Sequence, residues 1–117
     1  MNQEVPNTIS VQRLEAWISQ EVEKPLLVDV REDQELVIAP FSYPVVHLPL
    51  SELANWSSDL DNLIPIDRSV VVICHAGIRS RNFAIWLLQQ DSNYRIWNLE
   101  GGIDAWSALI DPEITRY

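Results

Sequence analysis

The only cysteine of the chain lies where an apolar run gives way to a helical pattern, in VVVICHAGIRS (residues 70–80). A Cys at the end of a strand and just before a helix meets the unpaired N–H groups and the positive dipole end of that helix. This setting favours the thiolate, which is the nucleophilic form. Gly77 permits a turn in which loop N–H groups converge on an anion. Cys74, Gly77 and Arg79 together therefore indicate a reactive cysteine, while Ser80 could hydrogen-bond the sulfur or, as we expect, cap the helix.

The elements that must position this cysteine follow from hydrophobic periodicity. Short apolar runs rich in branched residues predict strands at residues 26–30, 45–48, 69–74 and 94–100. Helical patterns occupy residues 31–39, 51–63 (as one helix or two short ones), 79–90 and 103–109. A further helix, with Ser10 as N-cap, is expected to precede the first strand and to end before Pro25. Apolar strands alternating with helices indicate an α/β fold, a parallel sheet with helices on both faces, whose ligands bind beyond the carboxyl ends of the strands.

Size, charge and cysteine content narrow the possible functions. The chain has 117 residues and a net charge of −9, so we expect one domain (residues 1–117, core about 8–110, short terminal tails, of which 111–117 is partly ordered) and no nucleic-acid partner. No run approaches the ~20 apolar residues of a membrane span, and the first residues lack secretory features, so we expect a cytoplasmic protein without a membrane partner. One Cys can form neither an internal disulfide nor a multi-Cys metal site, and we expect no metal or organic cofactor.

Four segments of the chain resemble the rhodanese-like family of sulfurtransferases. They are LLVDVRE (26–32), HLPLSEL (47–53), VVVICHAGIRS (70–80) and NLEGGIDAW (98–106), in the order found in the family. The resemblance implies a single α/β domain with a central five-stranded parallel sheet, a catalytic Cys and a loop whose amides surround it. It places the catalytic residue at Cys74. The predicted substrate-binding residues are His75, Ala76, Gly77, Ile78, Arg79 and Ser80.

The length of the loop bears on the choice of reaction. Four residues separate Cys74 from Arg79. Cys-dependent phosphatases and arsenate reductases resemble this arrangement but have one more residue there, and the wider loop holds a tetrahedral oxyanion. The shorter loop suits the single terminal sulfur of a persulfide. The resemblance therefore favours sulfur transfer, with a Cys-dependent phosphatase or arsenate reductase and a noncatalytic interaction module as the alternatives.

The expected activity is that of a thiosulfate sulfurtransferase or of a persulfide carrier. A small donor such as thiosulfate would give its outer sulfur to Cys74, and the persulfide would pass it to an acceptor in a second step. Because the chain has one Cys, the acceptor must be external: cyanide, a cellular thiol or a sulfur-accepting protein. The charge of −9 repels anionic donors, which predicts slow turnover with free thiosulfate and preference for a protein-bound donor.

Charged residues near the predicted site have supporting roles. Arg79 could clamp an anion or brace the loop by pairing with an acid such as Glu32 or Glu100, and the sequence leaves both roles open. Asp29 and Arg31 end a neighbouring parallel strand, and parallel strands end on the same side of a sheet. These two residues are therefore expected to support the active-site loop rather than to take part in the chemistry.

Overall fold

A computed structural model describes residues 5–117, and residues 1–4 of the predicted domain lie outside it. Its single sheet has the order β1-β5-β4-β2-β3, and every neighbouring pair is parallel. The strands are β1 (Asn7–Ile9), β2 (Leu26–Asp29), β3 (Val46–His47), β4 (Ser69–Ile73) and β5 (Arg95–Leu99). The α-helices are α1 (Val11–Gln20), α2 (Asp33–Ile38), α3 (Leu53–Trp56), α4 (Leu60–Leu63), α5 (Ile78–Gln90) and α6 (Gly102–Leu109), and two 3-10 turns, η1 (Leu50–Glu52) and η2 (Ser57–Asp59), flank α3.

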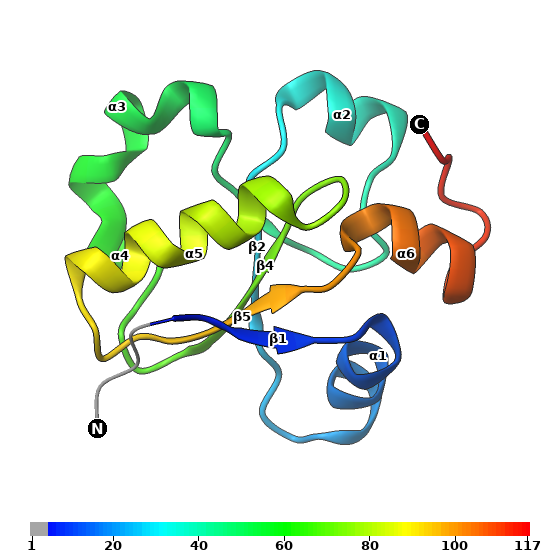
Figure 1. Cartoon of the computed structure of the whole chain (residues 1–117), viewed down its shortest axis with the longest axis horizontal. Coiled ribbons are helices and arrows are strands. Elements are labelled where there is room, and N and C mark those ends of the chain that lie inside the picture. Colours follow the sequence, from blue (N-terminus) through cyan, green and yellow to red (C-terminus); the bar gives the residue numbers. More distant parts are fainter. Residues whose placement is uncertain (1–4) are drawn as a thin grey trace.

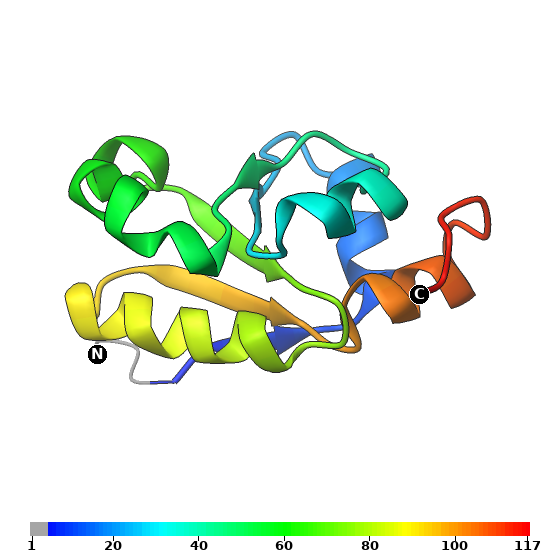
Figure 2. The same ribbon diagram turned by 90° about the horizontal axis from the view of Figure 1, so that it is seen from above.

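Helices cover both faces of the sheet, so the central strand β4 is buried on both sides (Figures 1 and 2). Val70, Val72 and Cys74 join the core formed with α3, α4 and α5. Val71 and Ile73 alternate with them and join the core formed with α1 and α6. This two-residue alternation, with apolar side chains in both directions, is typical of a buried parallel strand. Among the described residues no helix is long and apolar enough to cross a lipid bilayer.

The predicted α/β fold with five parallel strands is confirmed, and so is the cap of the first helix, where Ser10 Oγ accepts from the Arg13 N–H at 3.2 Å. One element was not predicted. Strand β1 precedes α1, so the expectation that this helix comes before the first strand is wrong. β1 has three residues, of which only Ile9 is buried, and so it shows no measurable periodicity.

The segment after α6 also differs from the expectation of a partly ordered tail. Ile114 is 8 % exposed and packs in the core beside α1 and α6, where Ser107 Oγ donates to its carbonyl. Arg116 forms two hydrogen bonds with Asp104 of α6, at 3.0 and 3.2 Å. These contacts bring the C-terminus beside α2 in Figure 1. Residues 111–117 are therefore part of the packed structure.

The N-terminus of α6 rests directly on the loop that follows β4. The N–H of Ile103 donates to the Cys74 carbonyl at 2.9 Å, and the N–H of Asp104 donates to the His75 carbonyl at 3.0 Å. A Cβ on Gly102 would lie 2.4 Å from the Cys74 carbonyl oxygen, and Gly102 has φ +57°. Only glycine fits a position with both constraints. The close approach therefore fixes two carbonyls of the cysteine loop.

We expect Gly102→Ala to lower the free energy of unfolding by roughly 2–4 kcal/mol, because it adds a left-handed non-glycine residue to a backbone clash. Urea denaturation measures this loss. Ala108→Ser, at an exposed position of the same helix, is the control and should change the stability by less than about 0.5 kcal/mol. Equal stability of Gly102→Ala and wild type would show that α6 can move away from the loop.

Candidate active site

Cys74 lies immediately after β4, on the side of the sheet that α5 covers, and is 1 % exposed with a free thiol. The N–H of Gly77 donates to its Sγ at 3.1 Å. Gly77 has φ +102°, and this left-handed turn lets the chain pass from β4 to α5 within a few residues. The sulfur thus lies at the N-terminus of a helix of 13 residues, where N–H groups and the helix dipole stabilise negative charge.

A buried polar pair completes the surroundings of the sulfur. Ser80 Oγ lies 3.2 Å from Cys74 Sγ and donates to Asn98 Oδ1 of β5. Asn98 Nδ2 donates to the Gly77 carbonyl at 3.0 Å, which orients its Oδ1 toward Ser80. The expectation that Ser80 caps α5 is wrong, because Gly77 is the N-cap and Ser80 lies inside the helix. Asn98, which the sequence analysis missed, therefore holds both the serine and the loop.

Arg79 forms a bidentate ion pair with Glu35 of α2, with N–O distances of 2.7 and 2.8 Å. Hydrogen bonds from Arg79 are the main reason that the pKa of Glu35 falls to about 2, and the same bonds raise the pKa of Arg79. The suggested partners Glu32 and Glu100 are thus incorrect. Glu35 also accepts from the Glu32 N–H at 3.0 Å in the capping box of α2. Arg79 therefore braces the loop against the start of α2.

Asp29 and Arg31 form a second pair, fully buried, at the carboxyl end of β2. Arg31 donates to both carboxylate oxygens of Asp29, at 2.9–3.2 Å, and to the Ala39 carbonyl at 2.9 Å. Its own carbonyl lies 2.6 Å from Nε2 of His47 at the end of β3. The remaining guanidinium nitrogen donates to the Tyr117 hydroxyl at 3.1 Å. The same nitrogen also lies 3.5 Å from the Glu35 carbonyl, so this pair is linked toward Arg79 through both Tyr117 and Glu35.

Tyr117 is a further neighbour of the site that was not predicted from the sequence. Its ring stacks on the His75 ring with a centroid separation of 4.1 Å and an angle of 14°. Its hydroxyl donates to Glu35 Oε2 at 2.8 Å and accepts from Arg31. Burial is the main cause of the raised pKa of this hydroxyl. No local signal identifies Tyr117, because its partners are distant in the sequence.

Two of the other predicted loop residues face outward. Ala76 is exposed, and Ile78, the first residue of α5, is 73 % exposed. His75 is half-buried beneath Tyr117. Among residues 5–117, no group of three or more His, Cys, Asp or Glu side chains is placed to hold a metal ion.

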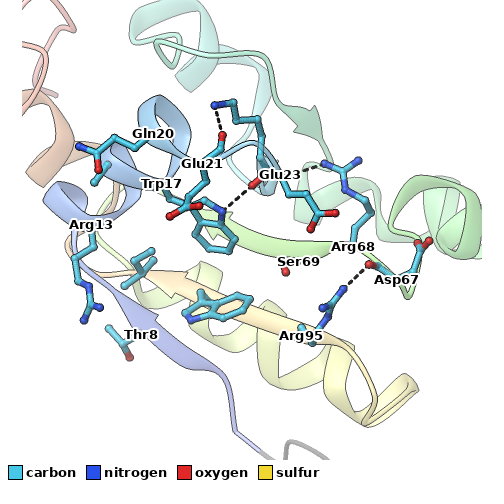
Figure 3. A pocket seen from close by; sticks show the side chains of 14 residues that line it. Thr8, Arg13, Trp17, Gln20, Glu21, Glu23, Asp67, Arg68, Ser69 and Arg95 are labelled. Atoms are coloured by element: carbon cyan, nitrogen blue, oxygen red, sulfur yellow. Dashed lines mark hydrogen bonds between the residues drawn. The ribbon is translucent and has the colours of Figure 1, made fainter.

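A large hollow lies between α1 and the strands β1, β4 and β5, on the face of the sheet opposite to that of Cys74 (Figure 3). It has a volume of about 1050 Å³ and includes the first residues of β4 and β5, whereas Cys74 follows the last residue of β4. Its cationic residues are Arg13, Lys24, Arg68 and Arg95, which are half of the eight Lys and Arg in the chain. This hollow is therefore separate from the cysteine site.

The distribution of cations leaves little free positive charge near the sulfur. Of the four Arg outside the hollow, Arg31, Arg79 and Arg116 are each paired with a carboxylate. Arg81 is exposed on α5. Around Cys74, the groups that favour an anion are therefore the Gly77 N–H, the helix terminus, the Ser80 hydroxyl and the charge of Arg79, which is shared with Glu35.

Comparisons with known proteins agree with this architecture. The chain is 36 % identical over 92 residues to the Arabidopsis thaliana protein "Rhodanese-like/PpiC domain-containing protein 12, chloroplastic"; the match covers 78 % of the chain and 30 % of that protein. It is 30 % identical over 105 residues to "Thiosulfate sulfurtransferase GlpE" of Actinobacillus pleuropneumoniae, covering 88 % of the chain and 90 % of that protein.

A solved structure gives the same result. The crystal structure of a rhodanese-related protein from Thermoplasma volcanium is 28 % identical and superposes with a TM-score of 0.67, over 93 % of this chain and 95 % of that one. The family description "Rhodanese-like domain" matches residues 10–109. With its fold, its cysteine loop and these matches, the chain belongs to the rhodanese-like domain family.

Proposed function

We propose that this chain is a sulfurtransferase that carries sulfane sulfur as a persulfide on Cys74. The observation that carries the proposal is the convergence on Cys74 Sγ of the Gly77 N–H, the N-terminus of α5 and the Ser80 hydroxyl. The Gly77 N–H and the helix terminus suit one small anionic sulfur held in place, and the Ser80 hydroxyl lies within reach to turn and donate to it. The relative named a thiosulfate sulfurtransferase, which aligns over most of both chains, supports the same reaction class.

In the first half-reaction the Cys74 thiolate attacks the outer sulfur of thiosulfate. A sulfur–sulfur bond forms to Cys74 while the sulfur–sulfur bond of the donor breaks, and its electron pair leaves with sulfite. Cys74 then carries a persulfide anion, and no oxidant or reductant is consumed. The loop N–H groups and the helix terminus stabilise the negative charge that this step places on the outer sulfur.

In the second half-reaction an external nucleophile removes that sulfur. A thiolate, or cyanide in an assay, attacks the outer sulfur, and the electron pair returns to Cys74 as the thiolate. The product is a new persulfide or thiocyanate. The acceptor is external because the chain holds one cysteine, so no internal disulfide can release the sulfur. The reaction is a two-step exchange with a covalent intermediate.

The Ser80 hydroxyl can change its hydrogen-bond partner according to the charge of the sulfur. Its hydroxyl has one proton, which is donated to Asn98 Oδ1, so toward a Cys74 thiol it can only accept. When the sulfur becomes a thiolate or persulfide, the hydroxyl can turn and donate to it instead. A hydrogen bond to an anion is stronger than one between neutral groups. Ser80 would then stabilise the charged states of the cycle over the neutral thiol.

The pairing of Arg79 bears on the phosphatase alternative. Both terminal nitrogens of Arg79 donate to Glu35, so its charge is already compensated by a carboxylate and only its remaining N–H donors could hold a phosphoryl group. The same pairing disfavours strong attraction of a free dianion such as thiosulfate. It supports a donor whose sulfur arrives on a thiol, small or protein-bound, as the better substrate.

Intact mass after donor treatment tests the proposal. We expect wild type to gain one sulfur atom from thiosulfate or from a thiol persulfide, with the thiol persulfide reacting faster, and to lose it to cyanide as thiocyanate. Cys74→Ser should gain nothing. A folded wild type with a titratable thiol that gains no sulfur from either donor would contradict the mechanism and favour a noncatalytic module. Phosphate-ester hydrolysis that depends on Cys74 would favour the phosphatase.

We expect Ser80→Ala to slow persulfide formation by roughly tenfold or more, because one hydrogen bond to the charged sulfur is lost. Stopped reactions analysed by mass spectrometry give the rate. The control is Ser58→Ala in η2, an exposed position, which should leave the rate unchanged. An unchanged rate in Ser80→Ala would show that the hydroxyl does not follow the charge of the sulfur.

We expect Glu35→Gln to lower the free energy of unfolding at pH 7 by about 1 kcal/mol. The effect is this small because solvent screens the ion pair, in which the Arg79 side chain is 38 % exposed. The pKa of Glu35 is lowered from 4.5 to about 2, so its contribution is complete above pH 4.5 and is lost as the pH falls toward 2. The stability gap between wild type and variant, measured by urea denaturation, should shrink over that window. Glu15→Gln on α1 is the exposed control. A gap that stays constant to pH 2 would refute the ion-pair explanation.

A further inference from the structure

The C-terminal segment is anchored on α6 before it reaches the site. Ile114 is buried in the core beside α6, and Arg116 pairs with Asp104 in the first turn of α6. Asp111 accepts from Ser42 Oγ at 2.6 Å, which ties the start of the segment to the loop after α2. Contacts with α6 and with the loop after α2 therefore fix the position of the last residues of the segment.

Tyr117 acts on both ends of the cysteine loop, at one end directly and at the other through Glu35. At the first end, its ring lies flat on His75, the residue after Cys74. At the other end, its hydroxyl donates to the same Glu35 carboxylate that holds Arg79. The Arg31 guanidinium, itself buried and held by Asp29, donates to that hydroxyl and fixes its direction.

These contacts complement the hold of α6 on the loop. α6 binds the carbonyls of Cys74 and His75 from the α6 side of the sheet, whereas Tyr117 acts on the side chains of His75 and, through Glu35, Arg79. A loop whose N–H groups must converge on one sulfur gains from restraint at both ends, since a shift of about 1 Å at such a site reduces the rate substantially.

We propose that Tyr117 is a positioning residue of the sulfur-transfer site, which holds the cysteine loop in its anion-binding shape from the C-terminal segment. The inference rests on the proposed function for its effect on rate, but its geometric part stands apart from the activity. The ring and the hydroxyl act separately: the ring restrains His75 by stacking, and the hydroxyl completes the hydrogen bonds of Glu35.

The matched variants are Tyr117→Phe, which keeps the ring, and Tyr117→Ala, which removes both groups. Tyr43→Phe is the control, because Tyr43 is as exposed (37 % against 38 %) and its ring lies against Trp106 rather than the loop. We expect kcat of sulfur transfer to fall roughly fivefold in Tyr117→Phe, because the variant loses the hydrogen bonds of one hydroxyl. In Tyr117→Ala, which also loses the stacked ring, kcat should fall at least about tenfold. KM should change less than twofold in each.

Two NMR measurements report the positioning without any sulfur transfer. The ring protons of His75 should be shifted upfield by the stacked tyrosine in wild type and Tyr117→Phe, and should lose this shift in Tyr117→Ala, with His47 as the internal reference. Amide exchange at Gly77, whose N–H donates to Cys74 Sγ, should be faster in Tyr117→Ala and unchanged at the amides of β2.

The outcomes separate this inference from the proposed function. A lost histidine shift and faster Gly77 exchange in Tyr117→Ala support the positioning role even if wild type transfers no sulfur. Unchanged kcat and unchanged Gly77 exchange in both variants, with only a lower melting temperature, would overturn it and reduce Tyr117 to a stabiliser of the tail. A change in KM alone would also overturn it, since it would mean that Tyr117 binds the donor.

Discussion

The contact between α6 and the cysteine loop is the constraint on which the site depends. A trans peptide unit is planar, so the direction of its carbonyl fixes the direction of the N–H on the other side. When two N–H groups of α6 take the carbonyls of Cys74 and His75, the N–H groups of the next residues must point away from α6. Gly102 permits the approach because a side chain there would overlap the loop. The shape of the loop is therefore set from outside it.

Charge pairing links the remaining segments around the same edge of the sheet. Asp29, Arg31, Tyr117, Glu35 and Arg79 form one chain of hydrogen bonds from β2 through the C-terminal segment and α2 to α5. A guanidinium buried as fully as that of Arg31 needs such partners, because an unpaired buried charge is strongly destabilising. This series of hydrogen bonds joins elements that the sheet alone would leave independent. Removing one member takes at least one hydrogen bond from the next member of the series.

The sequence reveals what depends on periodicity and local chemistry, and little that depends on distant pairing. The buried strand β4, the helix α5 and the turn between Cys74 and Gly77 are predictable because their residues are neighbours in the chain. Asn98, Glu35 and Tyr117 are not, because each meets its site partner across 18, 44 or 82 residues. Many acids could have paired with Arg79, and no pattern selects one. Only the packed fold decides which carboxylate lies within reach.

The placement of charge suggests how such a site works in an acidic protein. Half of the cations line the hollow beside α1, on the other face of the sheet, and the arginines nearest the sulfur are already paired. Long-range attraction of an anionic donor is therefore weak. The net charge of −9 adds an electrostatic field that repels such a donor from the protein. The N–H groups and the helix terminus act only at short range. Under the proposed function, such a site would stabilise the transferred sulfur more than it recruits the donor, and donors that dock through other contacts would be favoured.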